Sequence, residues 1–275
     1  YTSNHSLTEL QNQGTVNSNN NDYSIIFDYN NTGLFTTRSK YLYGIYNYGL
    51  FNSTSDTVTT RGGNNMYGIY NNSSNNSTMT DATISVDKGA NQSFGIYNET
   101  GLFTFDNATI TLTNTNQGYG AYMYNGGTVT AKRTNITVSD MTTTNNNYPS
   151  YGVYGEKGTF ILESGGISLY NNKNSYGIYL NTVNATYTQG IYDGRGTDAA
   201  DVSITNPRIS AIGTNTGIGV RMGDGTFNFY DGYITGSTSP RQAGDITSST
   251  DLNYQVKTEH DDESGYDYCI LEYNK

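Results

Sequence analysis

The chain has 275 residues and a net charge of −10, and it is dominated by small polar residues and tyrosine. Only 34% of its residues are apolar and 14% are charged, which is too little of both for an ordinary globular enzyme. The excess of acidic over basic residues argues against a basic surface that binds nucleic acid. No apolar stretch approaches the roughly 20 residues that a membrane-spanning helix needs. Because 13% of the residues are aromatic, the composition also argues against a disordered chain.

The remaining composition predicts an all-β protein outside the cell. The 32 Gly and 27 Tyr favour many short strands and tight turns over helices. The single cysteine, Cys269, excludes an internal disulfide framework and a thiolate zinc site, and no calcium-loop motif is present, so we expect neither a metal nor a cofactor. No signal peptide pattern is visible. The low lysine content and the abundance of Asn, Thr and Tyr favour the cell surface.

In chain order, residues 7–24 are Asn-rich and weakly patterned, and a tyrosine–glycine motif then recurs. Tyr-Gly-Ile-Tyr-Asn stands at 43–47 and 67–71, Phe-Gly-Ile-Tyr-Asn at 94–98, and weaker copies at 119–122, 151–154, 176–179 and 216–219. The period is about 25 residues, with one insertion at 142–150 and a larger one between 190 and 201. A β-propeller blade needs about 40 residues, so this period excludes a propeller.

Two further runs follow each copy of the motif, as at 101–105 and 108–112, and they alternate apolar and polar residues. Three short strands in about 25 residues form one coil of a parallel β-helix, in which successive coils stack. We therefore predict a single right-handed parallel β-helix of about nine coils over 1–239, with an atypical first coil. Residues 240–275 are predicted to form a β-hairpin cap, with strands at 252–257 and 266–271.

The alternation also predicts which side chains face the interior. Ile45 and its equivalents Ile69, Ile96, Ala121, Val153, Ile178 and Ile218 are expected to form an interior ladder. Residues two positions earlier (Tyr43, Tyr67, Phe94, Tyr119, Tyr151 and Tyr176) should also point inward, and the intervening glycines should point outward. The second tyrosines should then form an exposed column beside a glycine groove: Tyr46, Tyr70, Tyr97, Tyr122, Tyr154 and Tyr179. Asn47, Asn71 and Asn98 are expected to form an asparagine ladder at the following turn.

The three runs of each repeat, as at 94–98, 101–105 and 108–112, resemble the repeat-rich right-handed β-helix proteins of bacterial surfaces, especially those of gut Firmicutes. The architecture is also similar to the pectate-lyase-like superfamily and to autotransporter and adhesin stalks. The resemblance covers roughly residues 23–236. It implies the fold but no single function, because this fold carries lyases, hydrolases, tailspikes and adhesins.

The sequence favours a non-catalytic role over an enzymatic one. A hydrolase needs paired carboxylates, and the nearest candidates are Asp193, Asp198 and Asp201 in the larger insertion. The alternative hypothesis is therefore a carbohydrate-active enzyme or a phage tailspike-like domain with its cleft at this insertion. The interpretation that we prefer for these residues is a solvated loop, and the two histidines, His5 and His260, lie near opposite ends of the chain.

We expect an extracellular structural or adhesive segment whose tyrosine column binds a glycan or a surface protein of the host or of another microbe. Exposed tyrosines suit both partners, because each offers an apolar ring and a hydroxyl. The structural alternative is a column that only stabilises the sheet, at about 0.2–1 kcal/mol per ring pair. Self-association along the solenoid is compatible with the same pattern.

Overall fold

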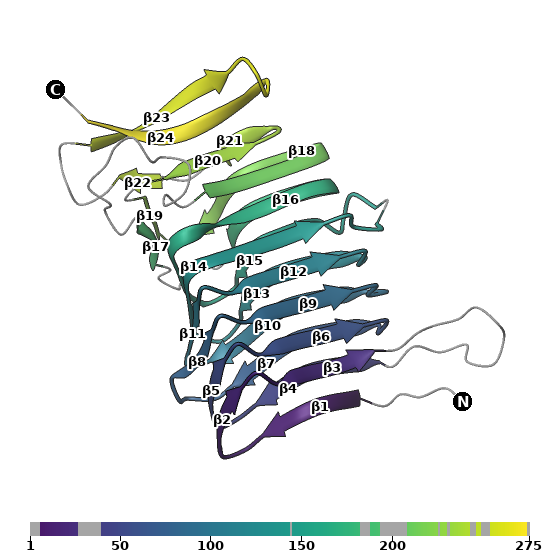
Figure 1. Ribbon diagram of the computed structural model, residues 1–275. Helices are drawn as coiled ribbons and strands as arrows, with labels where there is room; N and C mark the ends of the chain where they lie inside the picture. Colours follow the sequence, from purple (N-terminus) through teal and green to yellow (C-terminus); the bar gives the residue numbers. More distant parts are fainter. Residues whose placement is uncertain are drawn as a thin grey trace.

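The computed structural model describes residues 6–26, 40–143, 145–181, 188–192, 208–224, 226–229, 232–242, 246–248 and 254–273. Every regular element in these residues is a β-strand. The strands wind about one axis as a single right-handed parallel β-helix, with the first coil at one end and a hairpin at the other (Figure 1). None of the described residues forms a helix that is long and apolar enough to cross a membrane.

Eight successive coils each contribute one strand to each of three faces, which we name by their repeated side chains, and the described residues of a ninth coil contribute to the first two faces only. The tyrosine face consists of β1 (Ser6–Asn12), β4 (Tyr41–Asn47), β7 (Asn65–Asn72), β10 (Gln92–Thr100), β13 (Gln117–Met123), β15 (Ser150–Gly155), the last part of β16 (Gly158–Asn181), the last part of β18 (Arg208–Asp224) and β21 (Ser239–Gln242).

The phenylalanine face consists of β2 (Thr15–Asn19), β5 (Leu50–Thr54), β8 (Ser77–Thr80), β11 (Leu102–Asp106), the first part of β14 (Gly127–Ser139), the first part of β16, β17 (Thr188–Tyr192), β19 (Thr226–Phe229) and β22 (Ile246–Ser248). The isoleucine face consists of β3 (Asp22–Ile26), β6 (Thr57–Arg61), β9 (Thr83–Asp87), β12 (Thr109–Thr113), the last part of β14, the middle of β16, the first part of β18 and β20 (Tyr233–Gly236). Within each face, each strand therefore pairs in parallel with the equivalent strand of a neighbouring coil.

The core is a stack of apolar layers, one from each coil. On the tyrosine face the predicted ladder is confirmed: Ile45, Ile69, Ile96, Ala121, Val153 and Ile178 are at most 1% exposed. The isoleucine face adds Val58, Ile84, Ile110, Ile136, Ile167, Ile209 and Ile234. The phenylalanine face adds Phe51, Phe103, Val129 and Phe160. Burial of these side chains is the main favourable term in the stability of the fold.

The last predicted member of the interior ladder, Ile218, is buried, at 2% exposed, but it occupies a different position of the repeat. In the parallel register Ile218 pairs with Tyr176, whereas Val220 pairs with Ile178 and is 1% exposed. The repeat equivalent to Tyr176–Tyr179 is therefore 218–221, two residues later than the sequence alignment predicts. The insertion that precedes it removed the spacing on which that alignment depended.

Turns between the phenylalanine and isoleucine faces repeat the same backbone conformation. One residue per coil has a left-handed φ of 46–66°: Asn20, Ser55, Asp81, Asn107, Arg133 and Ser164. Asn and Asp adopt this region more readily than most side chains because they form local hydrogen bonds. Across successive turns the Nδ2 of Asn107 donates to Oδ1 of Asp81, at 2.7 Å. Five of these six residues are Asn, Asp or Ser, which are typical of turns.

A buried asparagine ladder follows the second tyrosines, as predicted. Nδ2 of Asn12 donates to Oδ1 of Asn47 (2.8 Å), Asn47 donates to Asn71 (2.7 Å), and Asn71 donates to Asn98 (2.7 Å). The ladder ends where Met123 takes the equivalent position, and Nδ2 of Asn98 donates instead to the carbonyl oxygens of Gly101 and Thr128. The ladder satisfies polar groups that are otherwise shielded from water.

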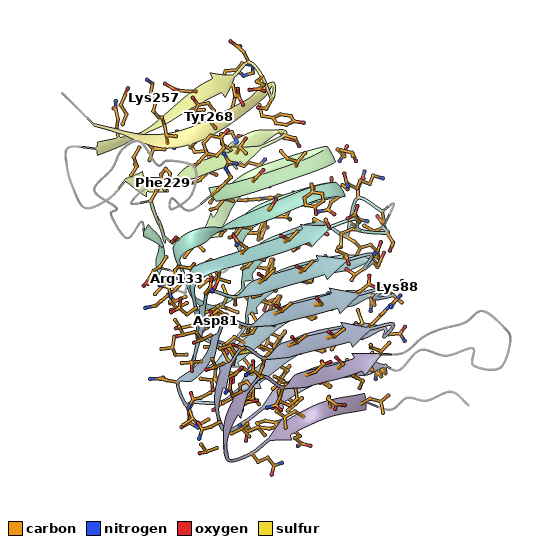
Figure 2. The ribbon with its side chains drawn as sticks, in the orientation of Figure 1. Asp81, Lys88, Arg133, Phe229, Lys257 and Tyr268 are labelled. Carbon is orange, nitrogen blue, oxygen red and sulfur yellow. The ribbon has the colours of Figure 1, made fainter. Side chains whose placement is uncertain are left out.

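A hairpin covers the far end of the solenoid. Its strands β23 (Tyr254–Asp261) and β24 (Tyr266–Tyr273) are antiparallel, and β24 also pairs antiparallel with β20. Lys257 and Tyr268 mark this hairpin in Figure 2. The predicted hairpin is thus present, but the parallel strands continue past residue 239 through β21 and β22, which pair with β18 and β19. The parallel part therefore ends later than the sequence predicts.

Candidate functional site

The tyrosine face carries two parallel columns of aromatic rings. The first column consists of Tyr43, Tyr67, Phe94, Tyr119, Tyr151 and Tyr176, with neighbouring ring centroids 4.8–5.5 Å apart. The second consists of Tyr46, Tyr70, Tyr97, Tyr122, Tyr154 and Tyr179, with centroids 4.6–5.4 Å apart. All these neighbours are stacked, with interplanar angles of 3–20°.

Rings of the two columns meet edge to face. Tyr43 lies 4.8 Å from Tyr46 at an interplanar angle of 77°, and Phe94 lies 5.3 Å from Tyr97 at 87°. Each ring therefore has stacked neighbours along its own column and perpendicular neighbours in the other, a herringbone arrangement. Offset-stacked and T-shaped pairs are the two favourable geometries for aromatic rings, at about 0.5–1.5 kcal/mol each beyond area burial.

The position of the first column corrects the sequence prediction. Phe94, Tyr119 and Tyr151 are 3–8% exposed, but they belong to an aromatic cluster with the second column and not to the apolar core. Strict alternation fails between Gly44 and Ile45, because both of these consecutive residues face the interior. Tyr43 and Tyr46, three positions apart, therefore lie together on the outside.

The predicted glycine groove is wrong for the same reason. A Cβ atom built on Gly44 would lie 2.5 Å from Cγ1 of Val58, on the isoleucine face of the same coil. The equivalent Gly95 would meet Cγ2 of Ile110 and the carbonyl oxygen of Gly120, both at 2.5 Å. These glycines let the two faces approach inside the core, and the space that was predicted for a flat ligand is filled by the first column.

Hydroxyl and carboxylate groups border the second column. The Tyr70 hydroxyl donates to Oε2 of Glu99, and the Tyr122 hydroxyl donates to Oε1 of Glu156 at 2.5 Å. Burial and then these carboxylates hold the pKa of both phenols far above its usual value of 10.0. Burial is also the largest cause of the raised pKa of Tyr97. Tyr70, Tyr97 and Tyr122 therefore stay neutral throughout the physiological pH range.

Different groups flank the two ends of the second column. At one end the Tyr46 hydroxyl lies 2.5 Å from that of Tyr48, which is 41% exposed. At the other end Arg221 takes the next position after Tyr179, and its guanidinium lies 5.0 Å from that ring. A guanidinium over an aromatic face is an attractive cation–π contact.

The six predicted binding tyrosines are thus brought together in one column, but they are half-buried and not fully exposed. Their ring faces are largely covered by stacked neighbours, so a partner meets ring edges and hydroxyls. Sequence reasoning missed Glu99 and Glu156, although each lies two residues after a column tyrosine, at Tyr97 and Tyr154. That recurrent spacing was the only available signal.

The candidate acidic site, Asp193, Asp198 and Asp201, lies outside the described residues. Within the residues that are described, no group of three or more His, Cys, Asp or Glu side chains is arranged to hold a metal ion. No protein-family model, curated protein or solved structure matches the chain.

Proposed function

We propose that this chain is a non-catalytic, extracellular structural or adhesive segment of a bacterial surface protein, and that its tyrosine face binds a glycan or a protein. The observation that supports the proposal most strongly is the herringbone of tyrosine rings along one lateral face of a parallel β-helix. Rings of the two columns pack edge to face against each other, so that a partner would meet a surface that is already ordered. Preorganisation of this kind reduces the entropic cost of binding.

The chemistry of the face favours a partner that forms hydrogen bonds as well as apolar contacts. Phenol hydroxyls and the carboxylates of Glu99 and Glu156 lie along the outer border of the second column. A hydroxyl-rich glycan or a polar protein surface is suited to such a border, because each offers donors to the carboxylates and apolar surface to the ring edges. Sugar stacking on a free ring face is not part of the proposal, because the faces are occupied by neighbouring rings.

Replacing two central tyrosines tests the proposal. In the double variant Tyr97→Ala and Tyr122→Ala, we expect binding on a glycan array or to a surface-protein partner to weaken by about 2 kcal/mol or more, as for other aromatic anchors. The free energy of unfolding should also fall, because each ring loses stacked and edge-to-face neighbours, so binding is measured where circular dichroism shows that the variant is folded. Unchanged binding together with a large loss of stability would show that the tyrosines only support the fold.

Absence of catalysis is a separate part of the proposal and has its own test. Incubation with acidic and neutral polysaccharides, followed by a reducing-sugar assay, should give no turnover. Turnover that Asp198→Asn or Asp201→Asn abolishes would instead favour the enzymatic alternative, with the cleft at the larger insertion.

A further inference from the structure

The second tyrosine column is an unbroken chain of oxidisable rings. Tyr46, Tyr70, Tyr97, Tyr122, Tyr154 and Tyr179 follow one another with centroids 4.6–5.4 Å apart. Phe94 interrupts the first column, and a ring without a hydroxyl is much harder to oxidise by one electron. The second column is therefore the continuous path for an oxidising equivalent.

Two exposed tyrosines connect this path to the surface. Tyr48 is 41% exposed, and its ring lies 4.7 Å from that of Tyr46. Tyr124 is 44% exposed, and its ring lies 6.1 Å from that of Tyr97 and 6.5 Å from that of Tyr122. An oxidant in solution reaches Tyr48 and Tyr124 more readily than the half-buried column tyrosines.

Two glutamates beside the column can accept the phenol protons. Oxidation of a tyrosine at neutral pH requires that its phenol proton leave with the electron, because the protonated radical is a very strong acid. The carboxylates of Glu99 and Glu156 accept hydrogen bonds from Tyr70 and Tyr122. Tyr97 stacks between these two tyrosines, at 5.1 and 4.9 Å. The two phenol–carboxylate pairs thus share one bridging ring.

We propose that this column relays oxidising equivalents between Tyr48 and Tyr124 as a tyrosyl radical, with Glu99 and Glu156 as its proton acceptors. A one-electron oxidant, such as a high-valent metal complex, takes one electron through the exposed Tyr124 from Tyr122, whose ring lies 6.5 Å away, and the phenol proton of Tyr122 passes to Oε1 of Glu156. The products are a neutral tyrosyl radical, a protonated carboxyl and the reduced oxidant. In the next step an electron passes from Tyr70 through the Tyr97 ring to Tyr122, Glu156 returns its proton, and Glu99 takes the proton of Tyr70.

A tethered oxidant tests the relay along the column. A ruthenium polypyridyl complex is attached to the cysteine introduced by Tyr48→Cys, and it is photo-oxidised with chloropentaamminecobalt(III) as the electron acceptor. The native Cys269 is fully buried and is not labelled. A nitroso spin trap then marks the radical sites, which are located by mass spectrometry. Tyr170 is 43% exposed and lies outside both columns, so it reports oxidation through solution.

We expect more spin-trap adduct on Tyr124 than on Tyr170. In the double variant Tyr70→Phe and Tyr97→Phe, we expect the amount of adduct on Tyr124 to fall to that on Tyr170. These substitutions keep the stacked rings and remove only the hydroxyls, so the fold is retained, as circular dichroism checks. Equal trapping on Tyr124 and Tyr170, or trapping on Tyr124 that the double variant does not change, would overturn the relay.

A second experiment tests the proton acceptors in the protein without the tether. Glu99→Gln with Glu156→Gln keeps both side chains close to their original size but removes the bases. Radical formation at Tyr70 and Tyr122 by a photogenerated ruthenium(III) oxidant in solution, located by the same spin trap, should become slower, and it should recover as the concentration of buffer base rises. Glu163→Gln is the matched control, because Glu163 pairs with Lys132 and not with a column tyrosine. A rate that is the same in the double variant and in the control would overturn the role of the carboxylates.

Discussion

Gly95 shows how one residue decides the width of the core. Its backbone lies so close to Ile110 and to the carbonyl oxygen of Gly120 that an added Cβ would be 2.5 Å from each. The same contacts recur at the equivalent glycines of the neighbouring coils, at 2.2–2.7 Å for Gly68, Gly120 and Gly152. Glycine is thus needed at this position for close approach, and not for an unusual φ angle.

Gly95→Ala is therefore expected to destabilise the protein by about 3 kcal/mol or more, because backbone atoms must move to admit the methyl group. The free energy of unfolding in denaturant, followed by circular dichroism, measures this loss. Gly14→Ala is the matched control, since a Cβ at Gly14 meets nothing within 4 Å. Equal stability of the two variants would contradict the close approach.

At the scale of elements, columns of like side chains join successive strands. In the asparagine ladder, Asn71 accepts a hydrogen bond from Asn47 and donates to Oδ1 of Asn98 and to the carbonyl oxygen of Thr100. Each coil thereby satisfies polar groups of its neighbour, in addition to the parallel backbone pairing. Register between coils is thus held by side chains as well as by the backbone.

Asn71→Ala should lower the free energy of unfolding by about 2–3 kcal/mol, because it leaves buried acceptors on Asn98 and Thr100 without this donor. Asn72→Ala provides the comparison at the adjacent, half-buried position, where Oδ1 accepts one hydrogen bond from Oγ1 of Thr100, and we expect a loss of about 1 kcal/mol or less. Chemical denaturation of both variants checks the difference. A similar small effect at both positions would show that the ladder contributes little.

The buried phenols of the tyrosine face should make the free energy of unfolding sensitive to alkaline pH. Burial is the largest cause of the raised pKa of Tyr67, Tyr97, Tyr119 and Tyr151 in the folded state. In the unfolded chain these phenols ionise near the ordinary value of 10.0. A raised folded pKa contributes stability that is fully present below pH 10.0 and is lost as the pH rises above it.

The free energy of unfolding should therefore fall steeply above about pH 10, and Tyr97→Phe with Tyr122→Phe should make the fall shallower. Denaturant titrations at increasing pH measure the slope, and tyrosinate absorbance shows when the phenols ionise. Ionisation of the column phenols at the pH of free tyrosine, without unfolding, would contradict the expected burial.

On the scale of the whole molecule, the two ends of the solenoid differ. At the far end β24 pairs antiparallel with β20, the Tyr268 ring stacks on Tyr233 at 4.9 Å, and Thr235 donates to the carbonyl oxygen of Asp267. In the first coil Leu7 is 40% exposed, whereas its partner in the next coil, Leu42, is fully buried. Within the part of the chain that the structure describes, the hairpin therefore covers strand edges at one end of the solenoid and not at the other.

A chain that stops after Ser248, and so lacks the hairpin, should associate end to end. Its β20 edge would be uncovered, and unpaired parallel edges are templates for pairing with another chain. Because the two ends are unlike, such contacts are head-to-tail and produce open filaments instead of closed dimers. Sedimentation velocity at increasing concentration should show growing species for the truncated chain and not for the full chain. A truncated chain that stays monomeric would show that the hairpin is not needed to block association.

Much of the fold was predictable because it depends on local periodicity. The period of about 25 residues and the alternation within each run predicted parallel coils, the buried positions of Ile45, Ile69 and Ile96, and the Asn47–Asn98 ladder. The register of the repeat at 218–221 was not predictable, because the insertion before it has no repeat spacing. The members of the second tyrosine column were predictable, but the first column that packs beside it and its partners Glu99 and Glu156 were not.

The sequence by itself determined the all-β class, the stacking of like residues and the terminal hairpin, since each follows from short-range patterns and turn chemistry. Only the tertiary structure decided that Tyr43 and its equivalents lie outside and that the glycines face inward. That outcome depends on how closely the isoleucine face approaches the tyrosine face, which Val58 and Ile110 determine from a distant part of each coil. The pairing of Tyr70 with Glu99 and of Tyr122 with Glu156 was likewise decided between coils, because stacking brings together groups that are 29 and 34 residues apart.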